Sequence, residues 1–480
     1  MIECSVFASV DLCPESAVVL LPFKQDKDSP IALFQEPSLL ASCNVLVRSQ
    51  DFVGKLGDTI LLYPEQGPRL LVVGLGEEIA ADVIRDGYAR AVALLVKRDI
   101  SSIAFFPPKA DEERVRWALE GIYLGAYQFT QYKTESVKKG IERIFCLTED
   151  SALFSRVEQK VSSVMNAVYL ARDLVNRNAD EVSAQGFSEI AASLDNGALR
   201  VQVHGKDWIE QERMHLLLAV GKGAVNEPRF IIAEWKGAPK DEDLTVLIGK
   251  GVTFDSGGLN LKSSSNMEGQ KGDMAGAAAV LAVMQAIRDL QLPINVTAAI
   301  PLCENSIDAK SYKPGDVYIS RSGRTVEILS TDAEGRLILA DAIDYVRERL
   351  NPSRIIDVAT LTGSAEVALG KDISALFSND DLLSNHLQEA GIRAGELMWP
   401  MPLYYPYAQL LDSEIADCKN VATSVGGAIN AALYLHKYVG DISWAHLDIA
   451  GPADMQKPFR YYGIGATGVP VRTLVEYLAR

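Results

Sequence analysis

Ser330-Thr-Asp-Ala-Glu-Gly-Arg-Leu337 joins a predicted β-strand to a predicted helix. The preceding Thr325-Val-Glu-Ile-Leu329 is apolar and rich in β-branched residues, as strands are. From Leu337 to Val346, apolar residues recur at the spacing of one helix face. Corners of this kind in an open α/β sheet line the crevice at the carboxyl ends of the strands, where ligands bind. The stretch therefore predicts an α/β fold with a binding site at this corner.

Charged residues stand at every second position of the corner, namely Asp332, Glu334 and Arg336. One explanation is an ordinary helix start, in which acids of the first turn offset the helix macrodipole. That explanation does not account for Arg336, because a cation is disfavoured in the first turn. The three residues are therefore candidates for a functional site.

A second charged stretch, Gly249-Lys-Gly-Val-Thr-Phe-Asp-Ser-Gly-Gly-Leu-Asn-Leu-Lys262, follows the strand pattern Leu244-Thr-Val-Leu-Ile248. Its glycines allow tight turns and close approach to a ligand. Asp273 comes shortly afterwards, at a position that also suits a helix N-cap. Together the two stretches and Asp273 supply four carboxylates and three cations: Asp255, Asp273, Asp332, Glu334, Lys250, Lys262 and Arg336. Such carboxylates would repel one another unless divalent metal ions, which carboxylate oxygens bind well, neutralise them.

Both charged stretches resemble the leucine aminopeptidase (cytosol aminopeptidase) family of dinuclear metallo-aminopeptidases. This chain has Ser330 where that family usually has Asn. The resemblance extends over roughly residues 160 to 480 and includes four further segments: Asp273-Met-Ala-Gly-Ala-Ala278, Asp357-Val-Ala-Thr-Leu-Thr-Gly363, His446-Leu-Asp-Ile-Ala-Gly451 and Gly465-Ala-Thr-Gly468. The resemblance implies two divalent metal ions per subunit, Mn²⁺ or Zn²⁺, and a bicarbonate ion.

The resemblance also assigns roles to single residues. It implies that Asp255 and Glu334 bridge the two metals and that Asp332 completes one metal site. Lys250 and Asp273 would complete the other site, Lys262 would stabilise the oxyanion, and Arg336 would hold the bicarbonate. The alternative for each lysine, and for Arg336, is a plain salt bridge to one of the acids.

The function that the resemblance implies is removal of N-terminal residues, leucine-like ones preferred, from peptides with a free N-terminus, by a homohexamer. Two alternatives stay open at this point. One is a dinuclear phosphoesterase, because two-metal carboxylate sites also serve phosphate chemistry. The other is a nucleic-acid-binding regulatory protein on the same scaffold, which a net charge of −16 opposes.

Composition favours a cytoplasmic protein with no membrane partner. The six cysteines are scattered without a CxxC pair, which is typical of a reduced compartment. The N-terminus lacks the pattern of a secretory signal, and no stretch of about 20 apolar residues predicts a membrane span. The five histidines form no HExxH pair, so oxygen ligands should dominate any metal site, and His446 is interpreted as a core residue.

The 480 residues exceed one typical core, which predicts two domains. We expect a smaller N-terminal α/β domain at 1–160 and a catalytic domain at 161–480 with a mostly parallel sheet flanked by helices. The boundary is expected in an amphipathic helix at about 160–177. Strands of the second domain are expected at Leu216–Val220, Phe230–Trp235, Leu244–Ile248, Val296–Ile300, Val326–Leu329, Arg354–Val358 and Ala445–Ile449.

Overall fold

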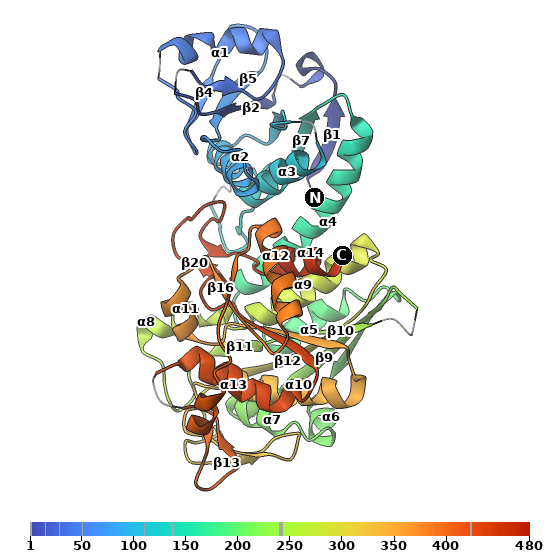
Figure 1. Cartoon of the computed structure of the whole chain (residues 1–480), viewed down its shortest axis with the longest axis vertical. Helices are drawn as coiled ribbons and strands as arrows, with labels where there is room; N and C mark the ends of the chain where they lie inside the picture. Colours follow the sequence, from blue (N-terminus) through green and yellow to red (C-terminus); the bar gives the residue numbers. More distant parts are fainter. Residues whose placement is uncertain are drawn as a thin grey trace. The chain divides into compact units, whose positions relative to one another are not determined.

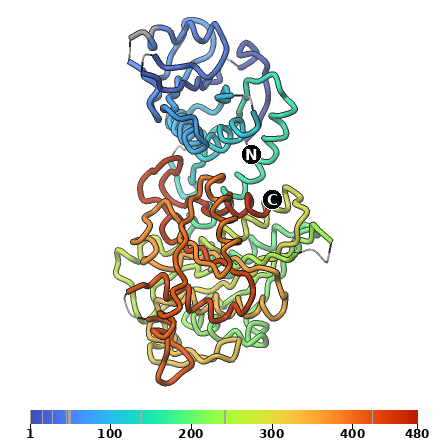
Figure 2. Tube along the Cα trace, viewed as in Figure 1, coloured from blue at the N-terminus to red at the C-terminus, as the bar shows by residue number. Residues whose placement is uncertain are grey.

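The computed structural model describes residues 2–14, 16–27, 29–49, 51–109, 111–135, 139–239, 243–422 and 425–480. The chain divides into two compact units. The smaller comprises Met1–Met165 with Lys457–Gly463, and the larger comprises Asn166–Gln456 with Ile464–Arg480. Figure 2 follows the chain from the first unit, in blue, through helix α4 (Ser151–Asn176) to the second. The predicted combination of a smaller N-terminal and a larger C-terminal α/β domain is confirmed.

The smaller unit is built on one mixed sheet. Its strands follow the order β1 (Glu3–Phe7), β7 (Arg143–Leu147), β6 (Ser102–Phe105), β2 (Val18–Lys24), β5 (Arg69–Gly74) and β4 (Thr59–Leu62), and β3 (Ile31–Ala32) pairs with β2. Helices α1 (Pro37–Ser49), α2 (Ala81–Val96) and α3 (Glu112–Ala126) accompany it, together with the first part of α4. Helix α3 lies directly on the backbone of α2, because a Cβ at Gly121 would stand only 2.5 Å from the carbonyl oxygen of Arg85.

The larger unit is built on a mixed nine-stranded sheet, whose four central strands are parallel and are flanked on each side by an antiparallel pairing. The central strands β19 (Ser443–Asp448), β15 (Arg354–Ala359), β10 (Leu244–Gly249) and β12 (Asn295–Asn305) are mutually parallel. The remaining strands are β17 (Met398–Pro400), β16 (Ser374–Ser378), β9 (Arg229–Lys236), β8 (Leu199–His204) and β11 (Gly251–Asp255), which pairs with β12. The buried, β-branched central strands are what a sheet covered on both faces requires.

Two groups of helices cover the two faces of this sheet (Figure 1). One group holds α9 (Ala275–Leu290), α12 (Asp381–Ala394) and α14 (Val471–Leu478), and the other holds α7 (His215–Val220), α10 (Gly335–Leu350) and α13 (Gly427–Val439). Helices α9 and α10 both pack on β10, β12 and β15, from opposite sides. Shorter helices are α5 (Ala184–Ala192), α6 (Lys206–Gln211), α8 (Ser264–Met267) and α11 (Gly363–Leu369). Apolar side chains are buried on both sides of the central strands, since α10 and α13 contribute to one core cluster and the α9 residues on the other face are buried as well.

Two of the expected strands differ from the structure. The run Leu216–Val220 is not a strand but lies in helix α7, because a short apolar run fits a buried helix as well as a buried strand. The strand predicted at Val326–Leu329 is the shorter β14 (Thr325–Glu327), and it pairs with β13 (Val317–Ile319) and β18 (Cys418–Lys419) in a separate small sheet. The corner of the sequence therefore follows a strand of this small sheet, not of the main one.

No helix within the described residues is both long enough and apolar enough to cross a membrane.

Candidate metal centre

Lys250 stands where strand β10 ends and strand β11 begins. Its backbone N–H donates to the carbonyl oxygen of Val358 on β15 (2.9 Å), and its own carbonyl accepts from the N–H of Ala277 on α9 (2.9 Å). Helix α9 can approach this closely because Gly276 has no side chain, and a Cβ there would lie 2.1 Å from the oxygen of Val358. The sheet and helix thus fix the Lys250 backbone at the carboxyl edge of the parallel strands, where ligands bind in such folds.

Asp255 ends β11 and is held by the glycine-rich loop that follows it. Its Oδ1 accepts from the N–H of Gly257 (2.9 Å) and from Nδ2 of Asn305 (2.8 Å). Gly257 has φ of +86°, and a Cβ there would meet Oδ1 of Asp332 at 2.8 Å. The turn therefore needs glycine both for its backbone conformation and for the close approach of the corner.

The corner brings Asp332, Glu334 and Arg336 to the start of α10. Glu334 is the N-cap residue of that helix, and Gly335 lets the helix start lie against Lys250. A Cβ at Gly335 would stand 2.5 Å from Cε of Lys250. The local sequence thus places a buried carboxylate next to a buried ammonium group.

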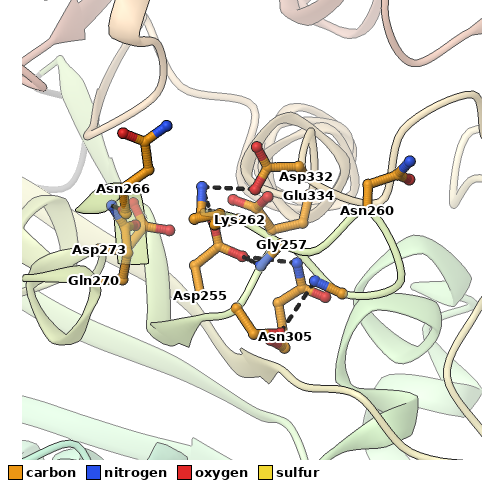
Figure 3. A network of polar contacts seen from close by, with 12 residues as sticks. Asp255, Gly257, Asn260, Lys262, Asn266, Gln270, Asp273, Asn305, Asp332 and Glu334 are labelled. Carbon is orange, nitrogen blue, oxygen red and sulfur yellow. Dashed lines mark hydrogen bonds and ion pairs between the residues drawn. The ribbon is translucent and has the colours of Figure 1, made fainter. Parts of the chain in front are cut away.

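Six of the seven predicted site residues converge into one network. Figure 3 labels five of them, Asp255, Lys262, Asp273, Asp332 and Glu334. Nζ of Lys250 lies 2.7 Å from Oδ1 of Asp273 and 2.9 Å from Oε1 of Glu334. Nζ of Lys262 lies 2.8 Å from Oδ2 of Asp255 and 2.6 Å from Oδ1 of Asp332. The two lysines therefore link the four carboxylates in pairs.

Three of the carboxylates, Asp255, Asp273 and Glu334, are buried and offer oxygens that all lie within 4.8 Å of one another. Oδ2 of Asp273 and Oε2 of Glu334 are buried without a hydrogen-bond partner among the described residues. Buried carboxylate oxygens are normally hydrogen-bonded or bound to metal. The two bare oxygens make this cluster suited to hold divalent cations, which carboxylates prefer to bind.

Burial and crowding change the ionisation of these acids. Burial raises the pKa of Asp255 to about 6, with help from the Glu334 carboxylate. Burial also raises the pKa of Asp273 well above its usual range, and that of Asp332 in the same direction. Burial would raise the pKa of Glu334 too, but the Lys250 and Lys262 cations outweigh it and lower that pKa. The two lysines thus do not offset the cost of ionising all four buried carboxyl groups.

At the two lysines, the neighbouring carboxylates outweigh the effect of burial. Burial by itself would lower the pKa of Lys250, but the carboxylates of Asp273, Glu334 and Asp255 outweigh it and raise that pKa. The pKa of Lys262 is raised in the same way, chiefly by Asp255. In this arrangement both lysines are charged and form the salt bridges that the sequence left open as an alternative.

Arg336 lies apart from these salt bridges. It is buried, its Nη1 donates to the carbonyl oxygen of Asn420 (3.0 Å), and its Nε has no partner among the described residues. Within the described part of the chain no carboxylate lies at ion-pair distance from Arg336, so the alternative of a plain salt bridge is not found. Burial lowers the pKa of this guanidinium. Its position suits an anion that would neutralise it.

His446 is a buried residue of β19 outside the carboxylate cluster, and its Nδ1 lies 2.6 Å from Oδ1 of Asp357 on the neighbouring strand. The suggested N-cap role of Asp273 is not found, because the N-cap residue of α9 is Met274. The Asp273 carboxylate instead accepts from Oγ1 of Thr360 (2.7 Å) and from Nζ of Lys250 (2.7 Å).

Sequence reasoning missed Thr360 and Asn305. Thr360 follows β15 directly, and its carbonyl oxygen also accepts from Nζ of Lys250 (2.9 Å). Asn305 is the last residue of β12 and joins Asp255 to the carbonyl oxygen of Thr331 (2.9 Å). Both residues stand at the carboxyl ends of central strands, so their position along the predicted sheet was the signal that could have found them.

Comparisons with known proteins agree with this geometry. Residues 19–136 match the family model described as "Cytosol aminopeptidase family, N-terminal domain", and residues 169–475 match "Cytosol aminopeptidase family, catalytic domain". The "Probable cytosol aminopeptidase" of Chlamydia trachomatis serovar D is 41% identical over 493 residues, which cover 98% of each chain. That of Protochlamydia amoebophila is 40% identical over 476 residues, with 96% of this chain and 95% of the relative covered.

Solved structures give the same result. A tomato leucine aminopeptidase mutant superposes with a TM-score of 0.88 at 30% identity, covering 100% of this chain and 97% of its own. The bottromycin maturation enzyme BotP in complex with Mn superposes with a TM-score of 0.86 at 32% identity, covering 97% of this chain and 99% of its own. The chain belongs to the cytosol aminopeptidase family, whose members are metal-dependent peptidases.

Proposed function

We propose that this member of the cytosol aminopeptidase family removes N-terminal residues, leucine-like ones preferred, from peptides with a free N-terminus, using two divalent ions. The observation that carries the proposal is the buried group Asp255, Asp273 and Glu334 with its two unpartnered carboxylate oxygens. Family membership favours this activity over the phosphoesterase and the nucleic-acid-binding alternatives.

The donor set fits two divalent ions, Mn²⁺ or Zn²⁺. Asp255 and Glu334 would bridge them, because these carboxylates come from different lysine-linked halves of the network and offer oxygens within 4.8 Å of each other. Asp332 would complete one site, and Asp273 with Lys250 the other. A lysine can act as a ligand only when neutral. Divalent charge among the same carboxylates would reverse the raised pKa of Lys250, because it replaces the ammonium as their counter-charge.

The residues around the cluster then have separate tasks. Bound divalent ions supply a water of lowered pKa and polarise the scissile carbonyl. Asp273 would also help to hold the free α-amino group of the peptide, beside the divalent ion that it helps to bind. Lys262, which is less buried than Lys250, would donate to the oxyanion as it develops. This arrangement restricts cleavage to the first peptide bond.

Arg336 would hold a bicarbonate ion that accepts and returns the proton of the attacking water. Its guanidinium has a free Nε and no carboxylate partner among the described residues, so a small planar anion could bind it in the fork geometry that carboxylates use. Arg336 and Glu334 both belong to the start of α10, which would keep this proton acceptor close to the carboxylate cluster.

A panel of aminoacyl-amide substrates, assayed with and without a chelator, tests the proposal. We expect cleavage fastest for leucine-like side chains, loss of activity after exhaustive chelation, and recovery with Mn²⁺ or Zn²⁺. N-acetylated versions of the same substrates should resist cleavage, because they lack the amino group that Asp273 binds. Full activity of the demetallated protein would contradict the metal mechanism, and equal cleavage of acetylated substrates would contradict the exopeptidase assignment.

We further propose a cytoplasmic homohexamer. The cytoplasm is supported by the six free cysteines and by the curated relatives, which are named cytosol aminopeptidases. The hexamer rests on the family resemblance alone. Light scattering under active conditions should return about six times the 52.2 kDa of one chain, and a monomeric mass would refute it.

A further inference from the structure

The corner that carries Asp332 and Glu334 has no regular secondary structure between β14 and α10. The backbone N–H and C=O groups of residues 329–333 therefore belong to no ladder or helix, and those that are buried must find other partners. Side chains supply them. The N–H of Thr331 donates to Oδ1 of Asn260 (2.8 Å), and its carbonyl accepts from the hydroxyl of Tyr312 (2.7 Å) and from Asn305.

Asn420 supplies four further hydrogen bonds to the backbone of the corner. Its Oδ1 accepts from the N–H groups of Leu329 (2.9 Å) and Ser330 (3.3 Å). Its Nδ2 donates to the carbonyl oxygens of Ser330 (2.6 Å) and Ala333 (3.4 Å). One fully buried amide thus forms hydrogen bonds to the backbone on both sides of Asp332.

The main chain of Asn420 touches the other functional group of the corner. Its carbonyl oxygen is the hydrogen-bond acceptor for Nη1 of Arg336 (3.0 Å). Its N–H donates to the carbonyl of Glu327 (3.0 Å), next to the pairing of β18 with β14. The small sheet therefore fixes Asn420, and Asn420 fixes both the carboxylate-bearing corner and the guanidinium.

We propose that Asn420 is a positioning residue of the metal centre, a role that rests on the proposed function. Its side chain holds the backbone from which Asp332 and Glu334 project, and its carbonyl orients Arg336. Groups that orient metal ligands in this way typically contribute about 10- to 100-fold to metal affinity or activity. The role needs both halves of the Asn420 amide. Its oxygen accepts from the N–H groups of Leu329 and Ser330, and its nitrogen donates to the carbonyls of Ser330 and Ala333.

Asn420→Ala tests the proposal against a matched control. Asn295→Ala removes another buried asparagine that accepts from one backbone N–H (Ala238, 3.3 Å) and donates to one carbonyl (Pro239, 2.9 Å), but at the amino end of β12. We expect Asn420→Ala to lower Mn²⁺ affinity or kcat about 10- to 100-fold with little change in KM. Asn295→Ala should lower thermal stability and leave both quantities unchanged.

Amide hydrogen exchange of the metal-free protein gives a readout that needs no activity. Peptides spanning 329–333 should exchange faster in Asn420→Ala than in wild type, and at the wild-type rate in Asn295→Ala. Asn420→Asp keeps the acceptor and loses the donors, so it should protect the amides of Leu329 and Ser330 while still lowering metal affinity. This variant also serves if Asn420→Ala does not fold.

Normal Mn²⁺ affinity, kcat and amide exchange of residues 329–333 in Asn420→Ala would overturn the proposal. If Asn420→Ala does not fold, normal Mn²⁺ affinity and kcat in Asn420→Asp would do so. A loss of thermal stability equal to that of Asn295→Ala, with metal affinity intact, would leave Asn420 a structural residue only. A wild-type protein without aminopeptidase activity would refute the proposed function, whereas exchange and Mn²⁺ affinity would still decide the role of Asn420.

Discussion

In the described part of the larger unit, two buried clusters of charged residues differ in whether all their carboxylate oxygens accept hydrogen bonds. Around Arg321, a second cluster is formed with Glu212, Asp341 and Asp344, and each carboxylate oxygen in it accepts at least one hydrogen bond. In the candidate metal centre, by contrast, Asp273 and Glu334 each keep one buried oxygen without a partner among the described residues. Burial and charge are common to both clusters, but only one has unfilled carboxylate oxygens.

The difference shows which observation identifies a functional site. Structural ion-pair networks also bury charges and perturb pKa values, as Asp341 does with a pKa that burial raises to about 7. A cluster in which every carboxylate oxygen accepts a hydrogen bond has no oxygen left for a cation. A cluster with bare, crowded oxygens is complete only when cations join it.

The largest effect is expected from Asp273→Asn. The substitution keeps an oxygen for Lys250 and for Oγ1 of Thr360 but removes one negative charge from beside Asp255 and Glu334. Activity should fall more than about a thousandfold, beyond the range of a single lost oxyanion donor. The metal-free protein should be as stable as wild type or more so, because the charge it loses is disfavoured by burial. Steady-state kinetics and calorimetry of the metal-free protein measure the two quantities.

Arg321→Met is the matched change in the second cluster. It leaves the Asp344 oxygen that now accepts from Nη1 of Arg321 (2.6 Å) buried and unpaired. Breaking a buried pair in this way should cost about 3–5 kcal/mol of stability, and added metal should not restore it. The folded fraction should retain wild-type kcat. If instead Asp273→Asn destabilises the metal-free protein as much as Arg321→Met, the two clusters are both structural.

The sequence predicted the site residues themselves better than the residues that hold them in place. Lys250 and Asp255 follow a strand pattern, so local spacing places them at the carboxyl edge of the main sheet. Glu334 starts a predicted helix, but the strand before it belongs to the small sheet, and it reaches the same edge because Gly335 packs against Lys250. Asn420 lies 84 residues beyond Arg336 along the chain, and no local pattern links it to the corner. The Arg321 cluster was not predictable either, since Asp341 and Asp344 lie within a helix pattern in which acids usually face solvent.

The error at Leu216–Val220 has the same origin. The N–H groups of Leu216 and Leu217 at the start of α7 both donate to Oδ2 of Asp341 (2.9 and 3.1 Å), a partner 125 and 124 residues away. That carboxylate caps a helix start whose own sequence carries no capping residue. Long-range partners decide such short apolar segments, and a single sequence does not reveal them.

Within the metal centre, the smallest expected difference is between the two lysines. Each forms ion pairs with two carboxylates, but Lys250 is more deeply buried than Lys262. Lys250 is almost fully buried and also donates to the carbonyl of Thr360, whereas Lys262 keeps 14% of its side chain exposed. If Lys250 is a metal ligand, Lys250→Ala should lower metal affinity, and added metal should partly restore activity. If Lys262 stabilises the oxyanion, Lys262→Ala should keep its metal and lose about 100- to 1000-fold in kcat, or roughly 2.7–4 kcal/mol.

Metal stoichiometry, kcat and KM under saturating and limiting metal separate these roles. If a lysine serves only as a salt bridge, its replacement by alanine should chiefly lower thermal stability, as we expect for Arg321→Met in the second cluster. Loss of metal from Lys262→Ala with retention in Lys250→Ala would reverse the two assignments. Retention of metal and near-normal kcat in both variants would remove both lysines from the reaction. The comparison of the two clusters would then rest on the carboxylates alone, since their bare oxygens do not depend on which lysine binds metal.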